Sequence, residues 1–179
     1  MKHSFVPFPT LVTQRLRLRE TIDEDHKEIF FLRSDAEVNK YIDRPVPKSM
    51  KDVEEFVQMI NKGTENGDNI NWTIALKEEP TKMIGSICLW NFSEDGKIAE
   101  VGYVLHPAFQ NKGIMTEAVQ CTIEYGFKKL KLDKIEAYTH RDNANSKHML
   151  LKNGFNLVAH KKDKDFPDNI ILEIQNTAI

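Results

Sequence analysis

Residues 109–118 read FQNKGIMTEA, in which Gly113 separates a polar stretch from a helical pattern. A strand pattern that ends at Leu105 comes shortly before it. Backbone N–H groups at the start of a helix can bind a phosphate, and a glycine there lets successive amides converge without a blocking side chain. The stretch therefore has two interpretations, a plain turn or a phosphate loop. It matches neither the Walker loop nor the dinucleotide-binding glycine pattern.

Strand and helix patterns lie on both sides of this loop. Before it, an antiparallel meander with turns at EEPTK and SEDGK is predicted by the segments NINWTIALKE, MIGSICLWNF and IAEVGYVLH. After it, one apolar helix face is predicted from Val119, Ile123, Phe127 and Leu130. The rest of the chain is expected to form a strand at KIEAYTH, a helix through SKHMLLKN that ends at Gly154, and strands around FNLVAHK and NIILEIQ.

The N-terminal third adds one strand and three helices to this expectation. RLRLR at residues 15–19 alternates arginine with leucine, which predicts a half-buried strand with its arginines on one face. Two short helices are expected to begin at Asp23 and Asp35 and to end before the prolines of RPVPK. A longer helix is expected after Ser49, where Asp52 completes a capping box. We therefore predict one α+β domain over residues 1–179.

Composition excludes several classes of protein. The chain has 179 residues, which suits a single domain with a core of enzyme size. Its net charge is −2 with both signs spread along the sequence, so no overall field attracts nucleic acid or an anionic membrane. No apolar run reaches the length of a signal peptide or a membrane span. We expect a soluble, cytoplasmic protein.

Cysteine, histidine and aromatic patterns indicate core packing rather than special chemistry. Cys88 and Cys121 lie in apolar contexts without a C-x-x-C motif, so both are expected to be reduced core residues. The six histidines show no metal-ligand spacing, so no metal is expected. Four aromatic residues alternate along the expected strands and are best explained by the core: Trp72, Trp90, Phe92 and Tyr103.

A second stretch, RDNANSKHMLLKNGF at residues 141–155, favours the phosphate-loop interpretation. With residues 109–118 it resembles the GNAT acetyltransferase superfamily, and more narrowly its RimJ/RimL-like branch of ribosomal-protein N-acetyltransferases. The family's acetyl-CoA loop, Q/R-x-x-G-x-G/A, is matched by Gln110 and Gly113, whereas Met115 departs from the small third residue. The later signature, N-x-x-S-x-x-x-L-x-K-x-G-F, is met in full by Asn143, Ser146, Leu150, Lys152, Gly154 and Phe155.

This resemblance implies a fold and a co-substrate. The fold is the GNAT acyl-CoA N-acyltransferase fold, a mixed, mostly antiparallel sheet of about seven strands flanked by helices. The co-substrate is acetyl-CoA, with no metal. Its pyrophosphate would be bound by the amides of Gln110, Asn111, Lys112, Gly113, Ile114 and Met115. Its pantetheine arm would lie as an extra strand beside the backbone of Val104 and Leu105 and bond to Asn143. Asn143 is also expected to cap the next helix, and Lys112 is equally well explained as a solvated lysine.

Catalytic residues follow from the same resemblance and from the chemistry of acetyl transfer. The reaction needs a base for the amine and an acid for the departing thiolate. Many relatives place a tyrosine where this chain has Leu151, so Ser146 is the candidate acid, with an N-cap serine as its other interpretation. Glu100 is the candidate base, with a surface carboxylate as its other interpretation. Weaker candidates for the base are Asp163, Asp165 and Asp168.

The predicted function is an N-acetyltransferase that moves the acetyl group of acetyl-CoA to a primary amine by direct attack in a ternary complex. The first candidate acceptor is the N-terminal α-amine of a protein, such as a ribosomal one. The alternatives are a small-molecule amine, either a polyamine or an aminoglycoside, and a non-catalytic acyl-CoA-binding module. Both a monomer and a homodimer are compatible with the sequence. The expectation depends on Met115 directing its side chain into the core and its amide toward the ligand.

Overall fold

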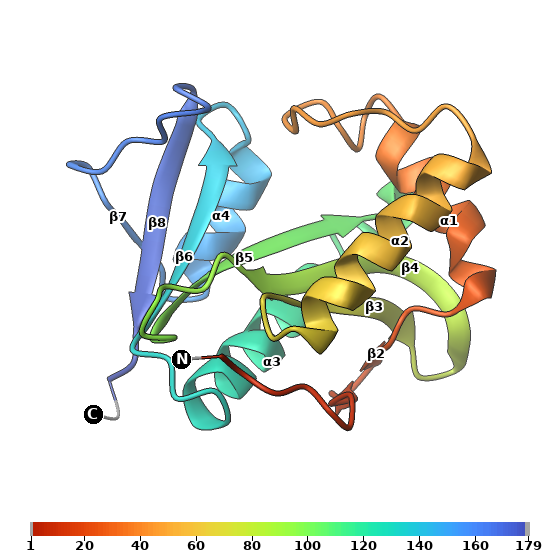
Figure 1. Cartoon of the computed structure of the whole chain (residues 1–179). Helices are drawn as coiled ribbons and strands as arrows, with labels where there is room; N and C mark the ends of the chain where they lie inside the picture. Colours follow the sequence, from red (N-terminus) through yellow and green to blue (C-terminus); the bar gives the residue numbers. More distant parts are fainter. Residues whose placement is uncertain (1, 178–179) are drawn as a thin grey trace.

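The structure, a computed structural model, describes residues 2–177. Its centre is one eight-stranded sheet in the order β1-β2-β3-β4-β5-β6-β8-β7 (Figure 1). Neighbouring strands are antiparallel except for the parallel pair β5 and β6. The strands are β1 Leu11–Val12, β2 Leu16–Arg19, β3 Ile70–Leu76, β4 Glu79–Trp90, β5 Ile98–Leu105, β6 Lys134–His140, β7 Asn156–Leu157 and β8 Asn169–Gln175. The expected mixed, mostly antiparallel sheet is confirmed, with two very short strands at its ends.

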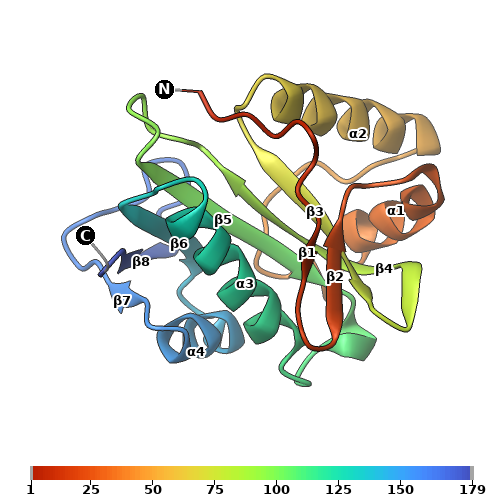
Figure 2. The ribbon, with the colours of Figure 1, turned by 90° about the horizontal axis from the view of Figure 1, so that it is seen from below.

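Helices cover both faces of this sheet. The helices are η1 Asp23–Asp25, α1 His26–Ser34, α2 Met50–Glu65, η2 Pro107–Phe109, α3 Ile114–Lys128 and α4 Ala144–Lys152. The apolar sides of α1 and α2 form one hydrophobic cluster. The second cluster lies across the sheet from it and contains the buried residues of α3 and α4. Figure 2 shows α3 and α4 together on this second side. Each face of the sheet therefore has its own pair of helices.

The helix predicted to begin at Asp35 does not form. Asp35 instead ends α1 as its C-cap, and its carboxylate accepts a hydrogen bond from the Val38 amide at 2.9 Å. This is the bond that an N-cap makes, and the Asp35 carbonyl also accepts the Asn39 amide at 3.1 Å, but residues 36–41 form only turns and do not extend into a helix. The first short helix is also shifted, because Asp23 lies in η1 and Asp25 is the N-cap of α1. The capping box of Ser49 and Asp52 at the start of α2 is confirmed.

The turn predicted at EEPTK lies earlier in the chain. β3 ends at Leu76 and β4 begins at Glu79, so the turn comprises Lys77 and Glu78. Two register shifts between β3 and β4, near Ala75, accommodate the displaced residues. Pro80 is tolerated inside β4 because residues 80–82 pair with no β3 residue, so its missing N–H breaks no bond between these strands. Its carbonyl accepts a bond from the Arg19 Nε at 2.7 Å.

The arginines of RLRLR do not behave alike, contrary to the simple alternating pattern. Arg17 is exposed, but Arg19 is buried and forms a two-pronged ion pair with Asp25, with Nη–Oδ distances of 2.7 and 2.8 Å. Two parallel charge-assisted bonds offset the cost of burying both charges. This pair joins β2 to the start of α1.

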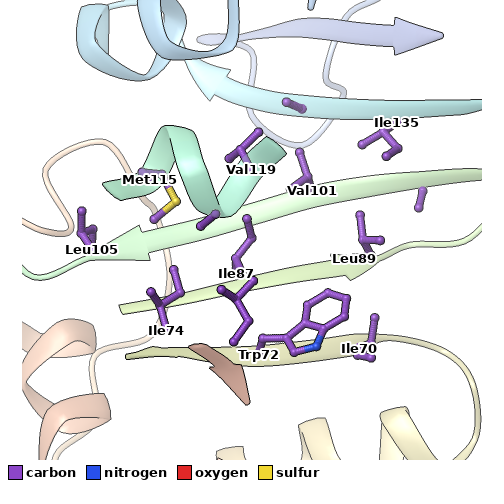
Figure 3. Close-up of a cluster of buried hydrophobic side chains, with 14 of the residues drawn as sticks. Ile70, Trp72, Ile74, Ile87, Leu89, Val101, Leu105, Met115, Val119 and Ile135 are labelled. Atoms are coloured by element: carbon purple, nitrogen blue, oxygen red, sulfur yellow. The ribbon is translucent and has the colours of Figure 1, made fainter. Parts of the chain in front are cut away.

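The main core lies between α3 and the sheet. Figure 3 shows Met115 and Val119 on α3 packed toward Val101 on β5 and Ile87 on β4. The buried face of the helix comprises Ile114, Met115, Ala118, Val119, Thr122 and Gly126, so the face predicted through Ile123 and Phe127 is only its half-buried flank.

Gly126 lies where α3 comes close to the sheet. A Cβ at this position would lie 2.9 Å from the Ile135 Cδ1, so a larger residue would require the end of the Ile135 side chain to shift.

Two predictions about core residues need correction. Trp72 is fully buried, but Trp90, the last residue of β4, is 46% exposed. Cys88 and Cys121 are free thiols as expected, although neither is fully buried. Burial raises the pKa of both thiols, so they are protonated at neutral pH.

The parallel strands β5 and β6 separate part way along their length. They pair only where residues 98–100 meet residues 134–136. Beyond Glu100 and Glu136 the two strands diverge, as Figure 1 shows, and neither has a partner strand on the side that faces the other. The backbone of residues 101–105 therefore borders a split in the sheet, directly before the loop at Gly113.

Candidate active site

The loop before α3 presents free amides. Gly113 is the N-cap of α3 and has a φ of 72°, in the left-handed region that favours glycine. Asn111 also lies in this region, with a φ of 59°. Among the described residues, the amides of residues 111–116 donate to no protein acceptor. A row of free donors at the positive end of a helix is a site for an anion.

Met115 leaves the space in front of these amides open. Its side chain is 9% exposed and belongs to the core between α3 and the sheet (Figure 3). A methionine is tolerated at this position of the loop because its flexible thioether fills space between buried aliphatic side chains.

Side chains of the loop hold it in place. Gln110 donates from its Nε2 to the Leu105 carbonyl at 3.0 Å, which fixes the loop to the end of β5. Lys112 donates from its Nζ to the Ala108 carbonyl at 2.7 Å. Both side chains are thus engaged within the loop, and the backbone carries its free hydrogen-bonding groups.

Arg15 is a member of this loop that sequence reasoning missed. Its Nε lies 2.6 Å from the Glu117 Oε2 on the first turn of α3, and its Nη1 donates to the Lys112 carbonyl at 2.9 Å. Arg15 also offsets the negative charge that Glu117 brings close to the anion site. No local pattern predicts these bonds, because they cross about a hundred residues of sequence.

Three hydroxyl groups meet on the α3 and α4 side of the split. The Ser146 Oγ lies 2.7 Å from the Tyr103 Oη of β5 and accepts a hydrogen bond from the Thr139 Oγ1 of β6 at 3.0 Å. These residues form the hydroxyl cluster. It bridges the two strands at the point where they no longer pair. Burial raises the pKa of Tyr103 to about 12, so its hydroxyl keeps its proton.

Ser146 is not the N-cap of α4. Asn143 is, because its Oδ1 accepts the Ser146 amide at 3.1 Å. The Ser146 hydroxyl is consequently free to join the cluster. Leu151, which occupies the position of the tyrosine found in many GNAT enzymes, is 45% exposed and has no proton to donate. Tyr103 was predicted to be a core residue only, because the pattern of a strand does not show what its hydroxyl contacts.

Glu100 lies on the opposite face of β5, where the pairing with β6 ends. Burial is the main cause that raises its pKa to about 7, and the nearby carboxylates of Asp163 and Glu136 add to the shift. The Asn91 side chain donates to its Oε2 at 3.5 Å. A carboxylate with a pKa near neutrality can accept and release protons at physiological pH.

Glu136 is the neighbour of Glu100 across the two strands, and it stays ionised. Burial acts to raise its pKa, but hydrogen bonds from Lys161 and Lys134 outweigh burial and keep the pKa below its ordinary value. The signal in the sequence was a charged residue inside a buried strand, KIEAYTH. Glu136 is therefore ionised and compensated by the two lysines, in contrast to Glu100.

The three aspartates of the last loop have different surroundings. Asp163 caps the turn that follows it, because its Oδ1 accepts the amides of Asp165 and Phe166. Asp168 forms an ion pair with Arg141. Asp163 and Asp168 thus stabilise the loop, whereas the Asp165 side chain is exposed.

Two hollows differ in their relation to this site. A cavity of about 40 Å³ lies between α1, α2 and the sheet, on the Glu100 face, and Val104 and Ser86 form its floor. A much larger hollow of about 1180 Å³ lies at the other end of the sheet, beside the C-terminal parts of α3 and β8. The large hollow shares no residue with the loop, the hydroxyl cluster or Glu100. It is therefore separate from the candidate active site.

The described residues contain neither a metal-binding cluster nor a membrane-spanning helix. Within residues 2–177, no group of three or more histidine, cysteine, aspartate or glutamate side chains is arranged to hold a metal ion. No helix in the same residues is long and apolar enough to cross a membrane.

Comparison with known proteins agrees with this geometry. Residues 15–156 match the family described as the Acetyltransferase (GNAT) domain. The chain belongs to this family. Among curated proteins, it is 32% identical over 151 residues to the uncharacterized N-acetyltransferase YoaA of Bacillus subtilis, which covers 83% of each chain.

Solved structures share the fold. RimL, a ribosomal L7/L12 alpha-N-protein acetyltransferase in complex with coenzyme A, superimposes with a TM-score of 0.81 at 20% identity, over 96% of this chain and 100% of the other. Spermidine N-acetyltransferase from Vibrio cholerae, in complex with CoA and spermine, gives 0.78 at 21% identity, over 91% and 96%. At these identities the likeness concerns the fold alone.

Family membership identifies the protein as an acetyl-CoA-dependent N-acetyltransferase. Acetyl-CoA is its co-substrate.

Proposed function

We propose that this N-acetyltransferase, acting as a single domain, acetylates the N-terminal α-amine of a protein by direct attack on acetyl-CoA. The observation that carries the mechanism is the split between β5 and β6, which has the hydroxyl cluster on one face and Glu100 on the other. A thioester in the split would have an acid on one side and a base on the other. The N-terminal amine is the first acceptor because the motifs resemble the RimJ/RimL-like branch.

Acetyl-CoA is proposed to bind along the loop and the free edge of β5. The amides from Gln110 to Met115 receive the pyrophosphate, since most of them have no protein acceptor. The backbone of Val104 and Leu105 receives the pantetheine arm as an added strand. The Leu105 carbonyl already accepts the Gln110 side chain, so this bond has to be shared or exchanged on binding. Asn143 bonds to the arm from the start of α4.

Ser146 is proposed as the acid that protonates the departing thiolate. The amine attacks the thioester carbonyl, a C–N bond forms, and the C–S bond breaks to leave the CoA thiolate. Ser146 passes a proton to the sulfur as it receives one from Tyr103, whose hydroxyl lies 2.7 Å away, and solvent returns the proton to Tyr103, because its high pKa does not allow a lasting phenolate. Thr139 donates to the Ser146 oxygen and holds it in place. No covalent enzyme intermediate is needed.

Glu100 is proposed as the base that removes the proton from the ammonium of the acceptor. With a pKa of about 7, half of this carboxyl is ionised at neutral pH, and the ionised form can take a proton directly or through a water. Glu136 keeps its charge, which Lys134 and Lys161 compensate, so the removal of the proton is assigned to Glu100 alone.

The experiment for this proposal is an acceptor screen with acetyl-CoA, read by release of the CoA thiol and by product mass. N-terminal peptides of proteins should be acetylated on their α-amine, and polyamines and aminoglycosides should give little product. Preferred turnover of a polyamine or an aminoglycoside would favour the small-molecule alternative. Absence of turnover with every amine, despite binding of acetyl-CoA, would contradict the proposed catalytic roles.

A further inference from the structure

Two arginines form one wall of the small cavity on the Glu100 face. Arg33, from the last turn of α1, and Arg44, from the segment between α1 and α2, both line it. The other lining residues are uncharged: Thr21, Ile29, Leu32, Phe56, Ile60, Asn71, Met83, Ser86 and Val104. Among the described residues neither arginine forms an ion pair. Two cations therefore share a partly buried cavity without an anion.

The guanidinium groups are held in place, yet they keep free donors. Arg44 donates from its Nε to Asn39 and from its Nη2 to the Leu32 carbonyl, at 2.8 and 3.0 Å, and its Nη1 donates to no described residue. The Arg33 guanidinium lies 3.9 Å from the centre of the Phe56 ring, and no hydrogen bond within the described chain uses it. The aromatic face leaves the N–H groups around its edge available.

The electrostatics of the two arginines are unfavourable without a ligand. The pKa of Arg44 is lowered to about 10. Burial is the main cause, and the charge of Arg33 acts in the same direction. Burial also lowers the pKa of Arg33. An anion in the cavity would relieve both effects, because it would compensate the burial and separate the like charges.

The cavity lies in line with the proposed base. Val104, in its floor, and Glu100 are on the same face of β5, four residues apart, which corresponds to ~13 Å along a strand. Gly102 lies between them and adds no side chain of its own, and the atoms nearest to its Cβ direction are the Cys88 Sγ and the Trp90 Nε1 of β4. Resting on the proposed function, we infer that the acceptor is an acidic N-terminal segment of a protein, whose amine reaches Glu100 while a carboxylate within about three residues binds Arg33 and Arg44.

The size and sign of the cavity fit a carboxylate better than other groups. About 40 Å³ holds roughly three waters, which is the size of a small polar group and not of a second ring system. Paired guanidinium forks match a carboxylate in geometry, and they repel the additional cationic groups of a polyamine or an aminoglycoside.

The test compares matched peptides that start with the same residue and carry aspartate, asparagine or lysine at the second, third or fourth position. With the wild-type enzyme, kcat/KM should be about tenfold or more higher for the best aspartate peptide than for its asparagine analogue, and lowest for lysine. A phosphoserine peptide at the same position and free spermidine complete the panel. A higher kcat/KM for phosphoserine than for aspartate, or for spermidine than for any peptide, would overturn the inference.

Substitutions of Arg33 and Arg44 test whether these two residues cause the preference for aspartate peptides. Arg33→Gln breaks no hydrogen bond of the described chain, so it is the first variant, and Arg44→Gln is the second. Each should abolish most of the aspartate preference, measured within that variant as the ratio of kcat/KM for the aspartate and asparagine peptides, and Arg33→Lys should restore part of it. Arg17→Gln, at an exposed arginine outside the cavity, is the control and should keep the preference.

The two proposals fail differently. Equal rates for aspartate and asparagine peptides, or an aspartate preference that survives in both arginine variants, would overturn the inference and leave the proposed acetylation of N-terminal amines intact. Absence of acetylation with every peptide would contradict the proposed function itself. Thermal stabilisation by acetyl-CoA serves as the check that each variant is folded and binds its co-substrate.

Discussion

At the scale of single residues, the chemistry depends on which atoms the fold brings within bonding distance. Ser146 has the same local surroundings in the sequence as many N-cap serines, yet its hydroxyl lies between Tyr103 and Thr139. Glu100 is one carboxylate among many on strands, yet burial brings its pKa to about 7. Both groups acquire their proposed roles from neighbours that are distant in sequence.

Ser146→Ala tests the acid. Loss of the proton donor should lower kcat by about a hundredfold, the lower part of the range for general acid catalysis, with little change in the binding of acetyl-CoA. Steady-state kinetics and a binding titration measure the two effects separately. Tyr103→Phe keeps the ring and removes only the resupplying hydroxyl, so its loss should be smaller. Unchanged turnover in Ser146→Ala would leave Ser146 as a residue of the first helical turn only.

Glu100→Gln tests the base through pH. The base form of Glu100 exists above its pKa, so wild-type kcat/KM should rise as the pH increases through about 7 and then level off. The variant should be slow and should lack this rise. An identical pH profile in the variant and the wild type would assign the titration to another group.

The pH dependence of the free energy of unfolding is a second test of the raised Glu100 pKa, and it uses the same variant. A carboxyl whose pKa is raised on folding destabilises the folded state progressively as the pH increases from its unfolded pKa to its folded pKa. For Glu100 this window extends from the ordinary value of 4.5 to about 7. The difference in the free energy of unfolding between Glu100→Gln and the wild type should therefore shift in favour of the variant when the pH is raised from 4 to above 7.

At the scale of elements, the sequence patterns located most helices and strands but misplaced some. Period-two and capping patterns predicted β6 at its observed bounds and α2 at its observed start, because these signals are local. The helix expected at Asp35 was wrong because its capping bond to Val38 starts a turn that residues 36–41 do not continue. The α3 face was misassigned because the prediction followed large apolar residues, whereas the small residues Ala118, Thr122 and Gly126 lie against the sheet.

Arg15→Gln tests the element that holds the loop. The change removes the bonds to Glu117 and to the Lys112 carbonyl, so the free amides should lose their fixed arrangement and Glu117 its counter-charge. We expect the KM for acetyl-CoA to rise several-fold to tenfold, since bonds to charged groups have this effect, with kcat nearly unchanged. Arg17→Gln on the same strand is the control. A fall in kcat at unchanged KM would place Arg15 in the chemistry instead.

At the scale of the whole molecule, the sheet positions the candidate catalytic residues on its two faces. Its two faces carry separate hydrophobic clusters, and β5 and β6 stop pairing beyond Glu100 and Glu136. In the proposed mechanism, acetyl-CoA and the acceptor approach this split from opposite faces. This arrangement favours direct transfer in a ternary complex over a covalent intermediate.

Binding of acetyl-CoA should stabilise the whole fold, because it fills the split and satisfies the amides before α3. A ligand at a hundred times its Kd stabilises the native state by about 2.7 kcal/mol, which calorimetry or thermal melting detects as a higher Tm. Desulfo-CoA separates the contribution of the thiol, and adenosine alone is the negative control. A Tm that does not move at millimolar acetyl-CoA would contradict the placement of the site at this loop.

The sequence by itself determined the class of fold, the loop at Gly113, the cap at Asn143 and the two candidate catalytic residues, because each depends on residues close together in the chain. Only the tertiary structure placed Tyr103 and Thr139 beside Ser146, Arg15 beside the loop, and Arg33 with Arg44 in one cavity. Those contacts join residues from different elements, and a local pattern carries no information about them. The raised pKa of Glu100 belongs to the same group, since burial is a property of the folded chain.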